Sequence, residues 1–217
     1  MKKLILSDFD GVWADSFELF CKENLLKFHE MGLSFPATPE DYLSLFEGSV
    51  LEQLRKHGAT DAQLHQLWNY LEKALETAHI SFFPGAYDFL ERNQLQIAII
   101  SSNHRKVVLD IMQKNNVSAE RFVEIQGGEI KSSKTQKMLA LCAKYAVQPQ
   151  DTLYLCDTIG DVLEARCAGV PSVGVAWGWH GRARLSRAKP DYLIENFVEL
   201  AQLISAWSSK VAAPNPC

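Results

Sequence analysis

The hydrophobic pattern of the chain consists of short, continuously apolar runs that alternate with helical patterns. Apolar residues at every position of a short run are typical of strands buried on both faces of a parallel sheet. Such runs predict strands at 4–6, 96–101, 122–126, 152–156, 172–176 and 192–194. Apolar residues at helical spacing predict helices at 86–93, 107–115, 135–145, 162–168 and 198–207. This alternation predicts right-handed crossovers and an α/β, Rossmann-like fold whose mostly parallel sheet is flanked by helices.

The segment directly after the first strand is helical in pattern throughout. Its apolar residues predict about four amphipathic helices, near 17–31, 39–46, 51–56 and 61–78. We expect these helices to form a separate cap over the end of the first strand. Pro84 and Gly85 break the helical pattern and mark its boundary. The alternative is that the same helices complete a single core.

The expected domain organisation follows from this pattern. Residues 1–14 and 84–210 form a Rossmann-like core, residues 15–83 form an inserted all-helical cap, and residues 211–217 form a disordered tail. A chain of 217 residues with 47% hydrophobic composition is long enough for one domain with a smaller insert.

Composition and charge exclude several classes of partner. The formal net charge of -4 provides no basic field, so we expect neither nucleic acid nor a membrane as a partner. No apolar stretch approaches the roughly 20 residues that a bilayer span needs. The five cysteines are scattered and form no CxxC pair, which indicates reduced thiols in a cytoplasmic protein. The oligomeric state is left open between monomer and homodimer.

Two acidic residues follow the first strand. Asp8 and Asp10 stand two positions apart, so an extended chain places them on one face and turns Phe9 toward the core. Open α/β sheets bind ligands at the carboxyl ends of their strands. A pair of carboxylates there suits a hard divalent cation, after which one aspartate can attack phosphorus and the other can transfer protons. The simpler interpretation is a strand end followed by a turn at Gly11.

The other predicted strands end in polar residues as well. Ser101, Ser102 and Asn103 follow the second predicted strand, and Asp157 follows the run at 152–156, with Asp161 four residues further. The basic turn before the helix at 135–145 contributes Lys131 and Lys134. Because the strands are expected to be parallel, these residues are expected to meet at one edge of the sheet.

The order and spacing of these pieces resemble the haloacid dehalogenase superfamily of phosphohydrolases. The most specific element is the run from Asp8 to Val12 with Asp15 and Ser16, followed by Asp157 with Thr158 and Asp161. The resemblance covers nearly the whole chain and is closest to the phosphoglycolate-phosphatase-like and β-phosphoglucomutase-like branch, in which a helical cap follows the first motif.

The resemblance implies a role for each residue, and the chemistry of each side chain agrees with that role. Asp8 is expected to be the nucleophile and Asp10 the general acid and base. Asp8, the Asp10 carbonyl and Asp157 are expected to bind Mg²⁺, and Asp161 to support the metal site or Lys134 from outside it. Lys134 is expected to offset charge on Asp8 and on the phosphate. The expected phosphate ligands are Ser101, the backbone amides of Ser102 and Asn103, and Lys134.

Each weaker site residue has a structural alternative. Ser101 and Asp161 can each be interpreted instead as the cap of the helix that follows. Lys131 is an alternative to Lys134, which we favour because it stands immediately before a predicted helix.

Five further residues near the motifs carry expectations of their own. Cys156 stands where the family commonly has glycine, and we expect a small buried thiol there. Trp13 replaces a smaller residue and is expected to shape the leaving-group side of the pocket. Trp179 and His180, like His104, are expected to be surface or loop residues without a catalytic role.

The leading hypothesis is a Mg²⁺-dependent phosphatase that hydrolyses a small-metabolite phosphomonoester through an aspartyl-phosphate. Gly48, Ser49 and Arg55 of the cap are the expected contacts of the leaving group. The alternatives are a sugar phosphomutase, in which Arg55 would replace the arginine that the family has near position 51, and a non-catalytic domain that binds a phosphorylated ligand. The presence of Asp10 favours cleavage of an oxygen ester over dehalogenation or phosphonate cleavage.

Overall fold

The computed structural model describes residues 3–209, without the side chains of residues 76 and 77. The expected tail at 211–217 lies outside this range. Six strands form one sheet in the order β3-β2-β1-β4-β5-β6, and every neighbouring pair is parallel. The strands are β1 (Leu4–Ser7), β2 (Ile97–Ile100), β3 (Glu124–Gln126), β4 (Thr152–Cys156), β5 (Ser172–Val175) and β6 (Tyr192–Ile194). The predicted fold class and its parallel sheet are therefore confirmed.

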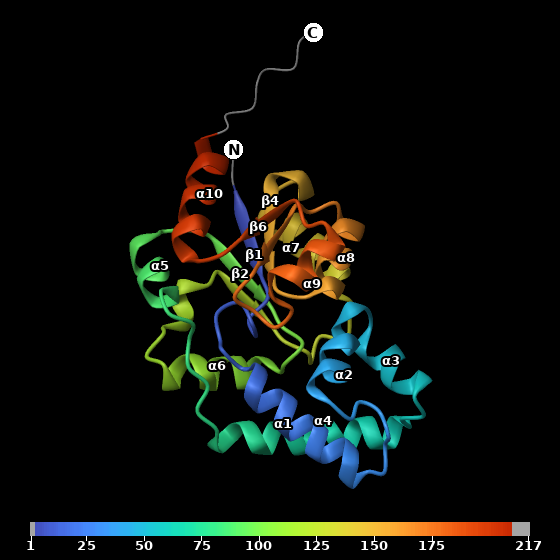
Figure 1. Cartoon of the computed structure of the whole chain (residues 1–217). Helices are drawn as coiled ribbons and strands as arrows, with labels where there is room; N and C mark the ends of the chain where they lie inside the picture. The colour runs from blue at the N-terminus through green and yellow to red at the C-terminus, as the bar shows by residue number, and fades with distance from the viewer. Residues whose placement is uncertain (1–2, 210–217) are drawn as a thin grey trace.

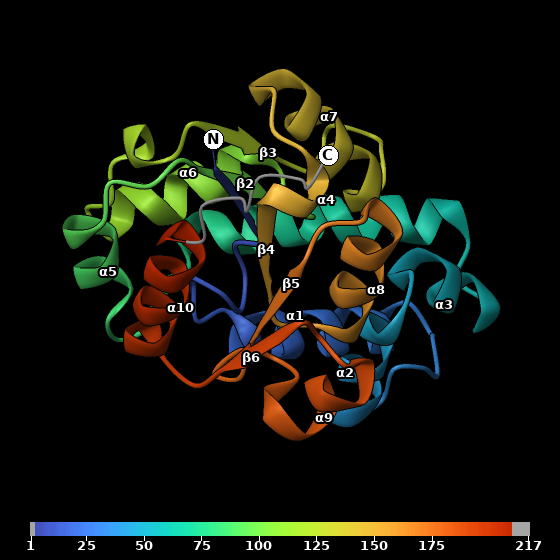
Figure 2. The ribbon, with the colours of Figure 1, turned by 90° about the horizontal axis from the view of Figure 1, so that it is seen from above.

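Both faces of the sheet are covered, which explains why the strands are apolar at consecutive positions. On one face, Ile5 of β1 packs with helices α5 (Ala86–Arg92), α6 (Arg105–Lys114) and α10 (Phe197–Ser209). On the other face, Leu4 and Leu6 pack with α7 (Lys134–Tyr145), α8 (Ile159–Ala168) and α9 (Gly181–Ala188). Figure 2 shows the two groups of helices on opposite sides of the strands.

The helices between β1 and α5 lie beyond the carboxyl ends of the strands (Figure 1). They are α1 (Phe17–Glu30), α2 (Pro39–Ser44), the short 3₁₀ helix η1 (Leu45–Glu47), α3 (Val50–Lys56) and α4 (Asp61–Thr77). Phe28, Leu45 and Leu67 belong to an apolar cluster of their own within this helical segment. We call α1 to α4 the cap. The boundaries at 14/15 and 83/84 stay a prediction.

Two antiparallel linkers join the cap to the sheet. Ala14 and Phe82 form an antiparallel bridge. The Asp15 amide donates to the Ser81 carbonyl at 2.8 Å, and the Phe83 amide donates to the Trp13 carbonyl at 2.9 Å. The chain therefore leaves the core and returns to it along one short two-stranded ribbon.

Helix α9 was not among the predicted elements. Its sequence carries few apolar residues, and only Leu185 and Ala188 are buried, so the pattern is too sparse to indicate a helix. Arg184 on α9 forms ion pairs with Glu40 at 2.7 Å and Glu47 at 2.8 Å, both from the cap. The polar face of this helix therefore contacts the cap.

Helix α8 begins three residues before its predicted start at 162. Thr158 caps it, because its hydroxyl accepts a hydrogen bond from the Asp161 amide at 3.2 Å. Asp161 therefore lies in the first turn of the helix.

Among the described residues, no helix combines the length and the apolar character that a bilayer crossing requires.

Candidate active site

Asp8 lies at the carboxyl end of the central strand and is almost fully buried. Its amide continues the pairing with β4 by donating to the Leu155 carbonyl at 2.9 Å. One carboxylate oxygen accepts a hydrogen bond from the Phe9 amide at 2.7 Å, and the other contacts Lys134 Nζ at 2.6 Å. Phe9 points into the core as expected. The strand and its first turn therefore fix the orientation of the Asp8 carboxylate.

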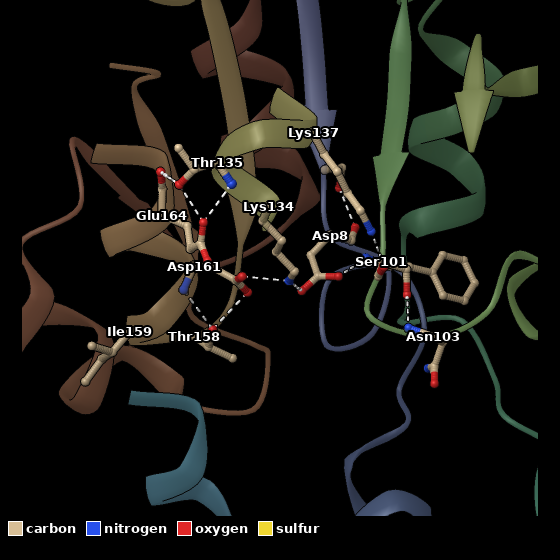
Figure 3. Close-up of polar contacts among 12 residues, drawn as sticks. Asp8, Ser101, Asn103, Lys134, Thr135, Lys137, Thr158, Ile159, Asp161 and Glu164 are labelled. Atoms are coloured by element: carbon tan, nitrogen blue, oxygen red, sulfur yellow. Dashed lines mark hydrogen bonds and ion pairs between the residues drawn. The ribbon is translucent and has the colours of Figure 1, made fainter. Parts of the chain in front are cut away.

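Lys134 connects Asp8 to a second carboxylate. It is the first residue of α7, and its ammonium lies 2.6 Å from Asp8 and 2.6 Å from Asp161 (Figure 3). Burial tends to lower the Lys134 pKa, but the charges of Asp161 and Asp8 outweigh it and raise the pKa. Lys131, the alternative, has an exposed side chain. Lys134 is therefore the lysine that reaches the aspartates.

Asp157 completes the acidic group at the end of β4. Ligand atoms of Asp8, Asp157 and Asp161 all lie within 4.8 Å of one another. Asp157 Oδ2 accepts a hydrogen bond from the Trp179 amide at 2.8 Å, whereas Oδ1 is buried with no hydrogen-bond partner in the described part of the chain. Burial, followed by the charge of Asp161, raises the pKa of Asp157 to about 8. Three buried carboxylates thus lie together while Lys134 contacts only two of them, and their oxygens fit a divalent cation.

Two glycines create the space that Asp157 occupies. A Cβ atom on Gly11 would overlap Asp157 Oδ2, and one on Gly178 would overlap the Asp157 Cβ and the Gly11 carbonyl oxygen. Gly11 also has φ +73°, a left-handed conformation that side chains disfavour.

The variant Gly11→Ala is expected to lose about 3 kcal/mol or more of folding stability, together with activity, because left-handed strain adds to the overlap with Asp157. Gly32→Ala is the matched control, since Gly32 has φ +72° but nothing within 4 Å of a Cβ atom. We expect it to cost about 1 kcal/mol through backbone strain alone. Thermal melts of both variants measure the difference, and equal losses would contradict the proposed crowding.

The loop after β2 positions Asp10. The buried Ser101 hydroxyl accepts a hydrogen bond from the Asn103 amide at 3.0 Å, and Asn103 Nδ2 donates to Asp10 Oδ2 at 2.7 Å. Helix α6 begins four residues after Ser101 and is preceded by His104, so Ser101 closes a turn and does not cap that helix. The side chain of Ser102 is exposed. Burial raises the Asp10 pKa, although hydrogen bonds, including that from Asn103, partly counteract the rise.

Asp161 does not cap α8, because Thr158 is the cap; the Asp161 carboxylate instead contacts both Thr158 and Lys134. Its second carboxylate oxygen accepts a hydrogen bond from the Thr158 hydroxyl at 2.8 Å at the start of α8, while the first faces Lys134. Burial favours a higher Asp161 pKa, but Lys134 outweighs this effect and lowers it. Asp161 is therefore held ionised beside Lys134.

Lys137 was missed by the sequence analysis. It is buried one turn after Lys134, and its ammonium donates to the Gly127 carbonyl at 2.8 Å and to the Ser101 carbonyl at 3.5 Å. Figure 3 shows it beside Ser101. The only signal in the sequence was its spacing of four residues before Leu141, which places Lys137 on the apolar face of the predicted helix. Lys137 links the chain segment after β3 to the Ser101 turn.

The three cap residues expected to contact the leaving group make different contacts. Gly48 lies against the start of α8, because a Cβ on Gly160 would come within 3.1 Å of the Gly48 carbonyl oxygen. Ser49 caps α3 by accepting a hydrogen bond from the Glu52 amide at 3.4 Å. The Arg55 guanidinium is half exposed and forms an ion pair with Asp61 at 2.9 Å. The structure therefore brings Gly48 to the core but directs Arg55 to an ion pair within the cap.

His180 is a loop residue, as one of the two expectations had it, but it does not lie at the surface. His180 is buried; its Nδ1 accepts a hydrogen bond from the Ile159 amide at 3.0 Å, and its Nε2 therefore donates to the Leu43 carbonyl at 3.0 Å. Trp179 follows β5 and packs against cap residues, with its ring centroid 4.9 Å from that of Phe46. These two loop residues connect cap and core.

The expected place of Trp13 is wrong. Its side chain is fully buried in the core between Phe89 and Phe197, and its Nε1 donates to Ser7 Oγ at 2.7 Å. Trp13 therefore packs in the core beneath the sheet edge, where its indole binds Ser7 at the end of β1, and it does not line a pocket. Cys156 is a buried thiol as expected, with its pKa raised by burial.

Comparisons with known proteins identify similar sequences and similar folds. The sequence model of the haloacid dehalogenase-like hydrolase family matches residues 5–175. The chain is 29% identical to a phosphoglycolate phosphatase from Synechococcus elongatus, over 93% of this chain and 96% of that protein.

Solved structures share the fold. A haloacid dehalogenase-like hydrolase from Streptococcus pneumoniae superposes with a TM-score of 0.75 at 21% identity, covering 94% of this chain and 98% of that one. CbbY from Rhodobacter sphaeroides, solved in complex with phosphate, superposes with a TM-score of 0.70 at 20% identity, covering 92% of this chain and 96% of that one.

Proposed function

Because the chain belongs to the haloacid dehalogenase-like hydrolase family, we propose that it is a Mg²⁺-dependent phosphatase acting on a small-metabolite phosphomonoester. The observation that carries this proposal is the convergence of Asp8, Lys134, Asp157 and Asp161 at the end of β1 and β4. The phosphoglycolate phosphatase from Synechococcus elongatus supports the choice of a small phosphomonoester.

Asp8 is the proposed nucleophile. Its carboxylate attacks phosphorus to form an aspartyl-phosphate, and the ester oxygen leaves with a proton from Asp10. Asp10 then takes a proton from water as that water attacks phosphorus, which releases phosphate and restores the Asp8 carboxylate. The raised Asp10 pKa favours the protonated acid that the first step needs. Asn103 holds Asp10 Oδ2, whereas Oδ1 has no hydrogen-bond partner within the described chain and is the oxygen proposed to exchange the proton.

The other residues bind the phosphoryl group and balance charge. Asp8, the Asp10 carbonyl and Asp157 would hold Mg²⁺, and the unpaired Asp157 Oδ1 fits a metal ligand. When bound, Mg²⁺ supplies positive charge that holds the phosphate against the Asp8 carboxylate. Lys134, fixed by Asp161, offsets the remaining negative charge. The Ser101 turn is proposed to donate hydrogen bonds to phosphoryl oxygens.

A panel of phosphorylated metabolites assayed for phosphate release tests the proposal. It should include 2-phosphoglycolate, sugar phosphates, nucleoside monophosphates and pyrophosphate, each with Mg²⁺ and with EDTA. Mg²⁺-dependent release of phosphate supports a phosphatase, whereas isomerised sugar phosphate without release would indicate a mutase. Arg55, paired with Asp61, gives no support to the mutase. Binding without any turnover would indicate a non-catalytic domain.

Mg²⁺ binding is expected to strengthen as the pH rises toward about 8. The Asp157 pKa is raised from 3.8 to about 8, so the metal-free fold favours the protonated carboxyl. The stability that this group contributes is fully present below pH 3.8 and is lost as the pH rises to about 8. Mg²⁺ must displace the proton below that pH. The gain in melting temperature from saturating Mg²⁺ over EDTA should therefore be larger at pH 8.5 than at pH 6. An equal or larger gain at pH 6 would contradict a role for Asp157 as ligand.

A further inference from the structure

The indole Nε1 of Trp179 is a buried hydrogen-bond donor that finds no acceptor among residues 3–209. Native proteins rarely leave such a group unpaired, because burial removes the water that would otherwise accept its hydrogen bond. Trp177 in the same loop shows the usual arrangement, since its Nε1 donates to the Val12 carbonyl at 3.0 Å. The unpaired donor of Trp179 therefore requires an explanation.

Trp179 lies beside the residues proposed for catalysis. Its amide donates to Asp157 Oδ2 at 2.8 Å. A Cβ on Gly11 would lie 2.8 Å from Trp179 Cδ1, the atom bonded to Nε1. The nitrogen-bearing edge of the indole therefore faces the turn that carries Asp10 and Gly11.

A second unpaired group belongs to the same turn. Asp10 Oδ1 is buried without a hydrogen-bond partner within the described chain, while Asn103 occupies Oδ2 at 2.7 Å. Asp10 Oδ1 and Trp179 Nε1 do not bind each other. One unpaired donor and one unpaired acceptor therefore belong to segments that meet at Gly11.

The surroundings of Trp179 hold its ring in one orientation. The ring packs against Phe46 at 4.9 Å with an interplanar angle of 84°, and against Phe17 at 5.7 Å, between ring centroids. The next residue, His180, is fixed by hydrogen bonds to Ile159 of the core and Leu43 of the cap. Because these contacts favour one orientation of the ring, the indole N–H is preorganised.

We propose that Trp179 determines substrate specificity by donating its Nε1–H to an oxygen on the leaving group. This inference rests on the proposed phosphatase function, in which Asp10 protonates the ester oxygen. The preferred substrates are then phosphomonoesters of small alcohols that carry a second oxygen, as hydroxyl or carboxylate, close to the ester oxygen. Phosphomonoesters without such an acceptor leave the indole N–H unpaired and bind less well.

The test compares three substrates and three proteins. 2-Hydroxyethyl phosphate and 2-phosphoglycolate carry the acceptor, as hydroxyl and carboxylate, and ethyl phosphate lacks it. The proteins are the wild type, Trp179→Phe and the matched control Trp177→Phe, each with Mg²⁺. Trp179→Phe removes the donor but keeps an aromatic ring and the amide bond to Asp157. Melting temperatures establish that each variant is folded.

We expect the ratio of kcat/KM for either acceptor-bearing ester to that for ethyl phosphate to fall about tenfold in Trp179→Phe. The ratio should stay unchanged in Trp177→Phe, whose lost hydrogen bond is internal to the protein. An unchanged ratio in Trp179→Phe would overturn the inference while leaving the phosphatase function intact. Absence of Mg²⁺-dependent turnover of every ester by the wild type would instead overturn the proposed function.

A second measurement does not depend on the folding of Trp179→Phe. In the Asp8→Asn protein, the indole proton of Trp179, identified by its nuclear Overhauser contacts with Phe46, should shift downfield when 2-hydroxyethyl phosphate binds. Ethyl phosphate should produce no such shift. Equal shifts with both esters would overturn the inference.

Discussion

Replacement of Asp8 by asparagine is expected to lower kcat by at least about 10⁴-fold, because an amide does not attack phosphorus and the aspartyl-phosphate cannot form. Asparagine keeps the size of the side chain, and its carbonyl oxygen can still accept the hydrogen bond from the Phe9 amide. Initial rates of phosphate release with saturating Mg²⁺ measure the effect on the best substrate of the panel.

The control for this experiment is Asp15→Asn. Asp15 belongs to the same N-terminal motif, but its side chain is exposed and it is not part of the acidic group formed by Asp8, Asp157 and Asp161. We expect its kcat to remain within about twofold of the wild type, as for most surface substitutions. The melting temperature of Asp8→Asn in EDTA should stay close to that of the wild type, because Lys134 keeps its ion pair with Asp161. Undiminished turnover by Asp8→Asn would end the proposal that Asp8 is the nucleophile.

Replacement of Lys134 by methionine is expected to impair both catalysis and folding. The ammonium lies 2.6 Å from both Asp8 and Asp161, and its side chain is only 15% exposed. Its removal leaves buried carboxylates without their cation, which costs about 3–5 kcal/mol. In a chain of this size the loss corresponds to a fall of about 6–20 °C in melting temperature. We expect kcat/KM to fall about 10²–10³-fold, because positive charge beside the phosphate is lost.

The pH dependence separates this electrostatic effect from a packing defect. Lys134 lowers the Asp161 pKa below its usual 3.8, so the stability it provides is present above that pH and is lost as the pH falls. The difference in melting temperature between the wild type and Lys134→Met, measured in EDTA, should therefore narrow as the pH falls below 3.8. A packing defect would give the same difference at every pH.

Lys131→Met is the matched control for Lys134→Met. Lys131 lies three positions earlier in the same turn and is exposed. We expect it to change neither the melting temperature nor kcat/KM measurably. A large loss of activity in Lys131→Met with little effect in Lys134→Met would reverse the assignment of the two lysines.

The sheet could be predicted because its signal is local. Strands buried on both faces are apolar at each position. In β1, Ile5 packs into the apolar cluster on one face of the sheet, and Leu4 and Leu6 pack into the cluster on the other. The residues at the strand ends could be predicted to converge because parallel strands share one carboxyl edge. The short and polar helix α9 carried too few buried residues for the same reasoning to find it.

The contributions of Lys137, Trp179 and His180 could not be predicted because they depend on contacts between distant segments. His180 is an acceptor for the core and a donor to the cap only after both have folded around it. Trp13 was misplaced for a related reason. Its position next to the motif indicated a pocket, but the turn at Gly11 directs it inward, where its indole supports Ser7.

The ribbon formed by Ala14 and Phe82 has a consequence for how such a protein can diverge. To the core, the cap is one long loop whose two ends are already held together, so the entropy of closing that loop hardly depends on how many residues it contains. Insertions, deletions or wholesale replacement of the helices between these two residues therefore leave the strand that bears Asp8 unstrained. Selection can therefore remodel the cap while the residues at the strand ends are inherited intact.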